Sequence, residues 1–317
     1  MTGVQTCALP IWHKEFVDLG VAGFWNDMNE PATWNHPGGT MPLDTPHCYD
    51  GQWTTHARAH NVYGFNMARA CHAGLRRLRP DDRPFVITRA AYAGIQRYSM
   101  VWTGDNHSNW EQFALSIPQC LNLSLSGVAF CGPDVGGFSW NCTGELLARW
   151  TQAGAFFPFF RNHSAQGTRR QEPWTFGPEV EAICKQYITL RYQLLPYLYG
   201  LFLEAARDGA PIMRPLFWEF PDDRPGYAID DQFLLGPALL VAPVLRQAAR
   251  QRAVWLPSGA DWYDFWTKQK HAGGQSITAP APLETMPLFV RAGTILPLTA
   301  PIMRSASPRP VIWPLIA

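Results

Sequence analysis

The segment Gly23-Phe24-Trp25-Asn26-Asp27-Met28-Asn29-Glu30-Pro31 decides the fold prediction for this 317-residue chain. Its apolar start, residues 21–26, gives way to polar residues, which is typical of a buried strand that ends in a loop. Further runs of this kind lie at 85–89, 100–104, 128–132 and 212–217. Helical patterns separate them, at 56–78, 110–122, 145–159 and 179–207. This alternation is typical of βα units around a parallel sheet.

The position of three carboxylates indicates which parallel fold this is. In a (β/α)8 barrel the loops after the strands converge on one mouth, where the reacting groups lie. Asp27, Asp105 and Asp134 each follow a predicted strand. A complete barrel needs about 250 residues, whereas the pattern occupies 12–221 and supplies five strands. We therefore predict an α/β fold with a partial (β/α)8 TIM barrel, about strands 4 to 8.

The pattern changes after Pro221 to short alternating apolar runs that are separated by Pro and Gly. This change predicts an antiparallel β-sandwich domain at 222–300. Residues 1–11 show no periodicity and are predicted to be a leader that matches nothing that follows. Residues 301–317 are predicted to be a Pro-rich tail.

Composition narrows the class of partner. The chain has 26 Lys plus Arg and 25 Asp plus Glu, and this formal charge of +1 gives no electrostatic case for nucleic acid or an anionic membrane. No stretch reaches the ~20 apolar residues of a membrane span. The seven Cys, without a CxxC pair, predict neither a disulfide framework nor a zinc site. We expect a cytoplasmic protein with a small neutral partner and an open oligomeric state.

Two of the carboxylates suit glycoside hydrolysis, which needs one group that attacks the anomeric carbon and one that protonates the leaving oxygen. Asp27 lies between Trp25 and Met28, side chains that can shape a pocket. Asp105 follows Trp102 and Gly104, and we expect the aromatic ring to keep this carboxyl partly shielded from water, as suits a general acid. The residues alone leave open a structural carboxylate or helix cap at Asp27 and a simple Asp-Asn turn at Asp105.

The motifs at these positions resemble those of glycoside hydrolase family 31, in particular its bacterial α-glucosidase-like members. Trp25-Asn26-Asp27-Met28-Asn29-Glu30 is similar to the nucleophile motif of the family, which implies that Asp27 forms the glycosyl-enzyme. Trp102-Thr103-Gly104-Asp105-Asn106 is similar to the acid/base motif, which implies that role for Asp105. Thr88-Arg89-Ala90 resembles a segment that supplies a substrate-binding Arg, here Arg89.

Two later segments extend the resemblance to the sugar site. Gly132-Pro133-Asp134-Val135-Gly136-Gly137-Phe138 resembles a family motif, with Pro133 where a small residue such as Ala is expected. Phe159-Phe160-Arg161-Asn162-His163 resembles another. The resemblance, which runs from about 12 to 298, implies that Arg161 orients carboxylates at the site. The predicted substrate-binding residues are Trp25, Met28, Arg89, Trp102, Asp134, Phe138, Arg161 and His163.

The function that the resemblance implies is retaining hydrolysis of terminal α-linked glucose from oligosaccharides or α-glucosides, without metal or cofactor. A retaining pair sits ~5 to 5.5 Å apart, and an inverting pair ~6.5 to 9.5 Å apart. His56 and His60 have the spacing of a helical metal pair but no third ligand in the sequence. Two alternatives remain: an α-xylosidase or another α-glycosidase of the same family, and a catalytically incomplete sugar-binding fragment, since family members place a sandwich and the first barrel strands before the nucleophile motif.

Overall fold

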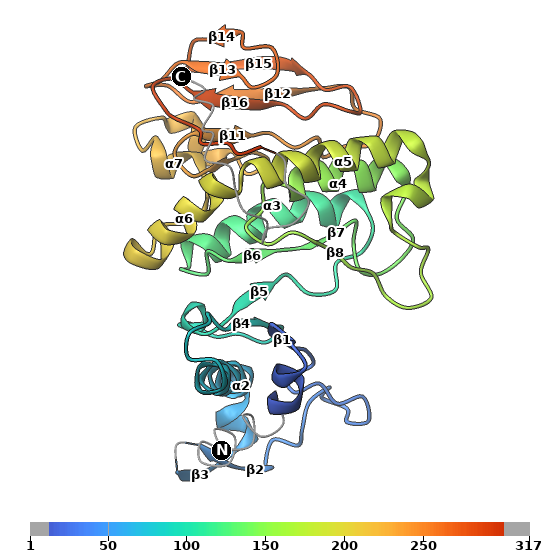
Figure 1. The fold of residues 1–317 in the computed structure, drawn as a ribbon, viewed down its shortest axis with the longest axis vertical. Coiled ribbons are helices and arrows are strands. Elements are labelled where there is room, and N and C mark those ends of the chain that lie inside the picture. Colours follow the sequence, from blue (N-terminus) through green and yellow to red (C-terminus); the bar gives the residue numbers. More distant parts are fainter. Residues whose placement is uncertain (1–12, 50, 301–317) are drawn as a thin grey trace. The chain divides into compact units, whose positions relative to one another are not determined.

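The computed structural model describes residues 13–49 and 51–300, shown in Figure 1. They fall into two compact units, one that ends at Trp102 and one that begins at Thr103. The predicted leader, 1–11, and the predicted tail, 301–317, lie outside the described residues. Each unit is described by itself.

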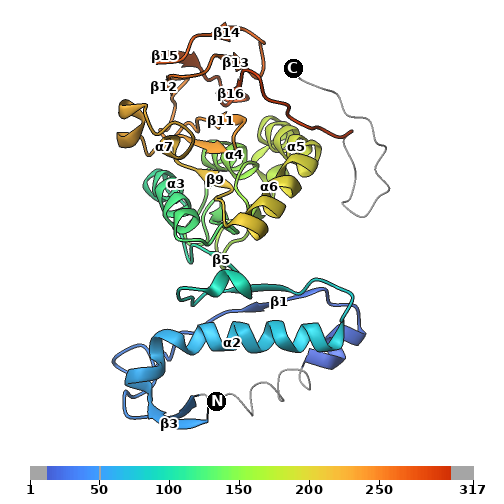
Figure 2. The same cartoon turned by 90° about the vertical axis from the view of Figure 1, so that its left-hand side faces the viewer.

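The first unit contains three parallel strands, β1 (Gly23–Asn26), β4 (Phe85–Thr88) and β5 (Met100–Trp102). The long helix α2 (His56–Leu78) runs beside them (Figure 2). A glycine permits this close approach, because a Cβ on Gly64 would lie 2.5 Å from the Cβ of Ala90 and 2.9 Å from the carbonyl oxygen of Asn29. The helix therefore packs directly against the loops that follow β1 and β4.

A hairpin of β2 (Pro46–Tyr49) and β3 (Gln52–Thr55) precedes α2 in the first unit. His47 of the hairpin is buried against the first residue of the helix, His56, with 3.0 Å between Nε2 and Nδ1. Thr40 Oγ1 lies 2.9 Å from the other ring nitrogen of His56. Both nitrogens of His56 are thus occupied by neighbours within the protein. The spacing of His56 and His60 accordingly belongs to a packed imidazole cluster.

The second unit begins with helices around short parallel strands. Its elements up to residue 208 are α3 (Trp110–Leu125), β6 (Cys131–Gly132), β7 (Asp134–Val135), α4 (Gly144–Gly154), β8 (Arg161–Asn162), η2 (Pro173–Phe176), α5 (Pro178–Gln193) and α6 (Leu195–Asp208). Polar side chains cap two of the helices: Asn109 accepts from Gln112 N at the start of α3, and Thr143 from Leu146 N at the start of α4. β7 pairs with β8 in parallel, so that Asp134 lies opposite Arg161.

The remainder of the second unit is antiparallel. Its elements are β9 (Met213–Arg214), α7 (Leu216–Glu219), η3 (Arg224–Ala228), β10 (Phe233–Leu235), β11 (Leu239–Val241), β12 (Gln251–Leu256), β13 (Trp262–Asp264), β14 (Lys270–His271), β15 (Gln275–Pro280) and β16 (Leu288–Arg291). Six of these strands form one sheet, in the order β14-β13-β16-β11-β10-β9, and β12 pairs with β15. Both sheets contribute to one buried core, which contains Leu240, Leu256, Trp262 and Phe289.

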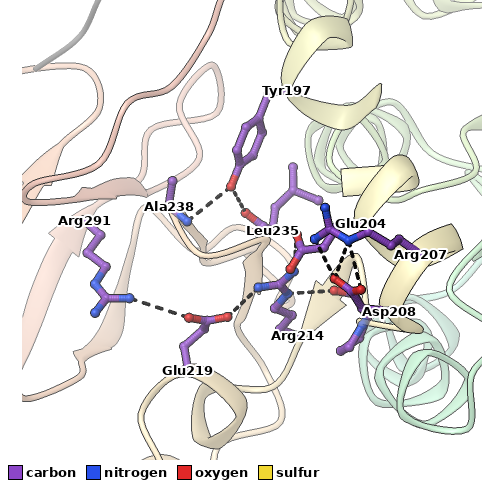
Figure 3. Close-up of polar contacts among 10 residues, drawn as sticks. Tyr197, Glu204, Arg207, Asp208, Arg214, Glu219, Leu235, Ala238 and Arg291 are labelled. Carbon is purple, nitrogen blue, oxygen red and sulfur yellow. Dashed lines mark hydrogen bonds and ion pairs between the residues drawn. The ribbon is translucent and has the colours of Figure 1, made fainter. Parts of the chain in front are cut away.

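Buried arginines join the two parts of the second unit. Arg149 of α4 is fully buried and donates to the carbonyl oxygens of Ala249, Ala281 and Thr285 in the antiparallel part. Figure 3 shows a second junction, in which Arg214 of β9 forms ion pairs with Glu204 of α6 and with Glu219 of α7. These contacts satisfy charges that would otherwise be costly to bury.

Two predicted elements differ from those observed. The predicted strand at 212–217 is shorter, because β9 covers only Met213–Arg214 and the chain then enters α7. β9 also pairs antiparallel with β10, in place of the parallel pairing that a barrel strand requires. The single helix predicted at 179–207 is divided into α5 and α6 at Leu194. Pro196 follows at once, and proline has no backbone N–H with which to continue the α-helical ladder.

Candidate active site

Asp27 lies directly after β1, at the point where the strand ends and the chain turns. Its carboxylate Oδ1 accepts a hydrogen bond of 2.8 Å from the backbone N–H of Met28. Met28 has a φ of 56°, a left-handed conformation that non-glycine residues adopt rarely and mainly where the surroundings impose it. The side chain of Asp27 is 37% exposed, so the carboxylate is held by the loop and is also reachable.

Arg89, at the end of the neighbouring strand β4, holds this loop from the side. Its backbone N–H donates to the carbonyl oxygen of Asn26 at 3.0 Å, which continues the ladder between β1 and β4. Its guanidinium places Nη1 3.5 Å from Asp27 Oδ1 and Nε 3.0 Å from Glu30 Oε1. Nη1 also donates to the sulfur of Met28 at 3.3 Å. Arg89 therefore fixes three side chains of the predicted nucleophile loop.

Buried polar side chains support the same loop from below. Asn29 donates from Nδ2 to Thr88 Oγ1 at 2.9 Å, and its Oδ1 accepts from the backbone N–H of Ala90 at 2.9 Å. The hydroxyl of Thr88 donates in turn to the carbonyl oxygen of Ala90. Asn29 is 2% exposed, so its amide stabilises the loop and does not face a ligand. The sequence indicated that Asn29 serves the site, but the part of Thr88 had no signal in the pattern.

Two tryptophans complete the predicted residues of the first unit. The rings of Trp25 and Trp102 pack edge to face with centroids 5.2 Å apart. Trp102 is buried, whereas Trp25 is partly exposed. The arrangement gives the end of the parallel strands an aromatic wall, with Trp102 as its fixed part.

The second unit carries Asp105 on a short turn after β5. Gly104 has a φ of 83°, which glycine adopts without strain, and the N–H of Asn106 donates back to the carbonyl oxygen of Gly104. The Asn106 carbonyl accepts from the N–H groups of both Phe138 and Ser139, at 2.7 and 2.9 Å. The turn is thus tied to the loop after β7. Asp105 itself is exposed, so the shielding by an aromatic neighbour that we expected is not observed.

Asp134 and Arg161 form a buried ion pair across β7 and β8. Arg161 donates from Nε and Nη2 to the same oxygen of Asp134, at 3.1 and 2.6 Å. Asp134 is fully buried, and the guanidinium also stacks over the ring of Phe159 at 5.3 Å. Pro133 lies between β6 and β7 without disturbing this pairing, because Asp134 keeps its place in the strand. The predicted carboxylate-orienting role of Arg161 thus has a geometric basis.

Phe138 and His163 stack face to face with ring centroids 5.2 Å apart. Their loops are linked, since the N–H of Ala165 donates to the carbonyl oxygen of Phe138 at 2.8 Å. Gln171, which the sequence did not single out, lies beneath the loop and donates from Nε2 to the carbonyl oxygens of Val135 and Gly137. Gln171 is almost fully buried, and a lone Gln without a periodic pattern gave no signal for this position.

Tests for other kinds of site concern the described residues only. Among residues 13–49 and 51–300 there is no group of three or more His, Cys, Asp and Glu side chains arranged to hold a metal ion. Over the same residues no helix combines the length and the apolar character of a membrane span.

Residues 5–201 match the family model of the "Glycosyl hydrolases family 31 TIM-barrel domain", and residues 209–296 match that of the "Glycosyl hydrolase family 31 C-terminal domain". The chain belongs to glycosyl hydrolase family 31. The predicted family and fold class are thereby confirmed: a TIM-barrel domain of family 31 followed by a C-terminal domain with an antiparallel sheet.

Individual family 31 proteins are similar over most of the chain. Alpha-glucosidase 2 of Bacillus thermoamyloliquefaciens is 52% identical over 286 residues, which are 90% of this chain and 36% of that protein. Human neutral alpha-glucosidase C is 44% identical over 283 residues, 89% of this chain and 31% of that protein. The chain thus spans about a third of the length of these relatives.

Solved family 31 structures resemble the chain closely. The Flavobacterium johnsoniae dextranase complexed with glucose matches with a TM-score of 0.87 and 39% identity, over 94% of this chain and 37% of that one. An α-xylosidase from a soil metagenome complexed with xylose matches with a TM-score of 0.82 and 31% identity, over 92% of this chain and 45% of that one.

Within the family 31 fold, the predicted site residues form two sets. Trp25, Asp27, Met28, Arg89 and Trp102 contact one another in the first unit. In the second unit, Asp134 pairs with Arg161 and Phe138 stacks on His163, while the Asp105 turn is bonded to the Phe138 loop. The catalytic and binding roles of all ten residues stay predictions.

Proposed function

We propose that the protein that carries this chain hydrolyses terminal α-linked glucose from oligosaccharides or α-glucosides with retention of configuration. The observation that carries the proposal is the loop after β1, where Asp27 is partly exposed and held by the Met28 N–H and the Arg89 guanidinium. A nucleophile needs to be ionised, reachable and fixed in direction, and this arrangement supports all three. The α-glucosidases among the relatives support the choice of glucose.

The proposed reaction has two steps. Asp27 attacks the anomeric carbon while Asp105 donates a proton to the glycosidic oxygen, so that a glycosyl ester forms and the leaving sugar departs as an alcohol. Asp105, now a carboxylate, accepts a proton from water, whose oxygen attacks the anomeric carbon and releases Asp27. Two inversions give net retention. Exposure of Asp105 suits the second step, since water has to reach this carboxylate.

The remaining residues are proposed to bind the sugar that is cleaved. Buried Asp134 retains oxygens that can accept from sugar hydroxyls, and Arg161 fixes its orientation. His163 contributes ring nitrogens, with Phe138 stacked against it as a support. Trp25 and Met28 are proposed to line the pocket near Asp27. This division assigns proton transfer and attack to two carboxylates and recognition to the other eight residues.

The direct test replaces Asp27 in the full chain. Asp27→Asn should lower kcat/KM for an aryl α-glucoside by roughly 10³-fold or more, because the variant keeps the shape of the side chain but cannot form the ester. Asp18→Asn, at an exposed carboxylate paired with Lys14, is the matched control and should leave kcat/KM unchanged. Proton NMR of the first sugar released should show α-glucose. A β-anomer as first product would refute retention.

Asp105 is tested through the leaving group. Asp105→Ala should lower kcat/KM for maltose far more than for α-glucosyl fluoride, because fluoride departs without protonation. Equal losses for both substrates would contradict the acid role.

A second substrate has support from one neighbour, the α-xylosidase bound to xylose. Comparison of kcat/KM for nitrophenyl α-glucoside and α-xyloside decides between the two sugars, and we expect the glucoside to be preferred. A sugar-binding fragment without turnover remains the other reading, and it would bind glucose with no release of nitrophenol.

We further propose a cytoplasmic location. The six cysteines among the described residues are free thiols and five of them are buried, which is the usual state in a reducing compartment. Fractionation of the source cells tests this directly.

A further inference from the structure

Trp140 is an exposed tryptophan that the proposed reaction does not yet use. It is 58% exposed, and its indole lies almost parallel to the imidazole of His107, with ring centroids 4.2 Å apart and 7° between the planes. The backbone of Trp140 has a φ of 71°, a conformation unusual for a bulky residue. An aromatic side chain held flat at the surface in this way needs a physical reason.

Backbone contacts fix the stacked pair. Ser139 and His107 form an isolated parallel bridge, and the N–H of Ser108 donates to the carbonyl oxygen of Ser139 at 2.8 Å. The Ser108 hydroxyl donates to the carbonyl oxygen of Trp140. Gly137 allows the two segments to lie this close, since a Cβ there would be 2.6 Å from Ser108 Cα. The indole is therefore held in one orientation by both loops.

The pair also lies beside the proposed acid. His107 is two residues after Asp105, and the residue between them, Asn106, accepts the N–H groups of Phe138 and Ser139. Trp140 thus stands on the loop that is bonded to the Asp105 turn. The leaving oxygen has to be within hydrogen-bond reach of Asp105, so the sugar attached to that oxygen has to lie on the Asp105 side of the cleaved bond.

We propose that Trp140 is a stacking platform for the leaving-group sugar, with His107 as the positioning residue behind it. One indole face is covered by His107, and the C–H face of a pyranose ring suits the other. The ligand class is an α-linked di- or oligosaccharide, and a monosaccharide glycoside with a small aglycone would gain nothing from the platform. This inference rests on the proposed function for the role of Asp105.

The test measures binding of two sugars to the full chain by calorimetry. Methyl α-glucoside fills only the cleaved-sugar position, whereas maltotriose also reaches the leaving-group side. Trp140→Ala should weaken maltotriose about tenfold, the size expected when an indole face is no longer buried. The same variant should change the Kd of methyl α-glucoside less than twofold. Trp140→Phe should restore most of the maltotriose affinity.

Trp218→Ala is the matched control. Trp218 is a 45% exposed tryptophan on α7 in the antiparallel part of the same unit, and its loss should alter neither Kd. His107→Ala should weaken maltotriose by less than Trp140→Ala, because the indole remains but loses its support.

The outcomes separate the platform from the proposed function. Equal effects of Trp140→Ala on both sugars, or no effect on maltotriose, would overturn the platform even if the unaltered chain hydrolyses α-glucosides. A tenfold selective loss in a chain without turnover would support the platform and overturn the proposed function. Failure of the unaltered chain to bind either sugar would overturn both.

Discussion

Replacement of Arg149 by Met should destabilise the second unit, because Arg149 is the buried junction between α4 and the antiparallel part. The guanidinium donates four hydrogen bonds, to Gln152 Oε1 and to the carbonyl oxygens of Ala249, Ala281 and Thr285, at 2.7 to 3.1 Å. Methionine fills a similar volume and cannot donate. Three carbonyl groups and one amide would thus lose their partner in a buried place.

The magnitude follows from two opposing terms. Hydrogen bonds from a charged donor contribute about 1.5 kcal/mol each at the lower end, so that four amount to about 6 kcal/mol. Burial lowers the pKa of Arg149 to about 10, which corresponds to a desolvation cost of about 3 kcal/mol that the variant no longer bears. The expected net loss in the free energy of unfolding is therefore about 3 kcal/mol.

Urea unfolding of the full chain, followed by circular dichroism, measures this loss. Arg250→Met is the matched control, because Arg250 also bridges α4 and the antiparallel part, through Glu145 at 2.8 Å, but is half exposed. Exposed pairs contribute about 0 to 1 kcal/mol. If Arg149→Met cost no more than Arg250→Met, the assignment of Arg149 as the junction would be wrong.

Three further predictions concern pH, thiols and one glycine. Burial lowers the pKa of His56 and of His47, so the unfolded chain binds protons more readily; stability should hold above pH ~6.5 and fall below it, by at most about 1.4 kcal/mol per pH unit for each histidine, and a pH series of urea midpoints that stays flat would contradict this. The cluster that they face contains also His60 and Tyr63. Burial raises the pKa of Cys71 to about 12, so iodoacetamide at pH 8 should leave it unmodified in the folded chain while partly exposed Cys48 is alkylated; peptide mass spectrometry checks the order, and equal labelling would be the adverse result. Gly137→Ala should cost more than about 1 kcal/mol, because φ is 87° and the added methyl meets backbone atoms of Ser108, and an unchanged thermal midpoint would refute it.

The parts of the fold that the sequence predicted well are those with local signals. Residues 23–26, 85–88 and 100–102 are strands because their apolar runs are buried on both faces of a parallel sheet, and such runs are visible without a structure. The strand at Met213–Arg214 is only partly predictable. Its apolar flanks gave the strand, but its antiparallel partner, β10, is chosen by packing some 20 residues further along the chain.

The candidate site shows the same limit. Asp27 and Asp105 were recognisable because each follows a strand within a dense motif. The ion pair of Asp134 with Arg161 depends on the register of β7 and β8, which is set by residues 27 positions apart and is not encoded in either motif alone. The exposure of Asp105 is likewise a property of how the turn is anchored through Asn106, and no neighbour in the sequence indicated it.

Arg89 contacts two carboxylates, Asp27 at 3.5 Å and Glu30 at 3.0 Å, and this double pairing has a consequence for the catalytic cycle. In the proposed reaction Asp27 becomes a neutral ester and regains its charge only when water arrives. An arginine with one partner would stand as an isolated cation throughout that interval, next to an anomeric centre that is itself electron-poor. With Glu30 as a constant counter-ion, the guanidinium stays neutralised whether or not Asp27 is esterified. The local charge balance then changes by one unit without any side chain having to move.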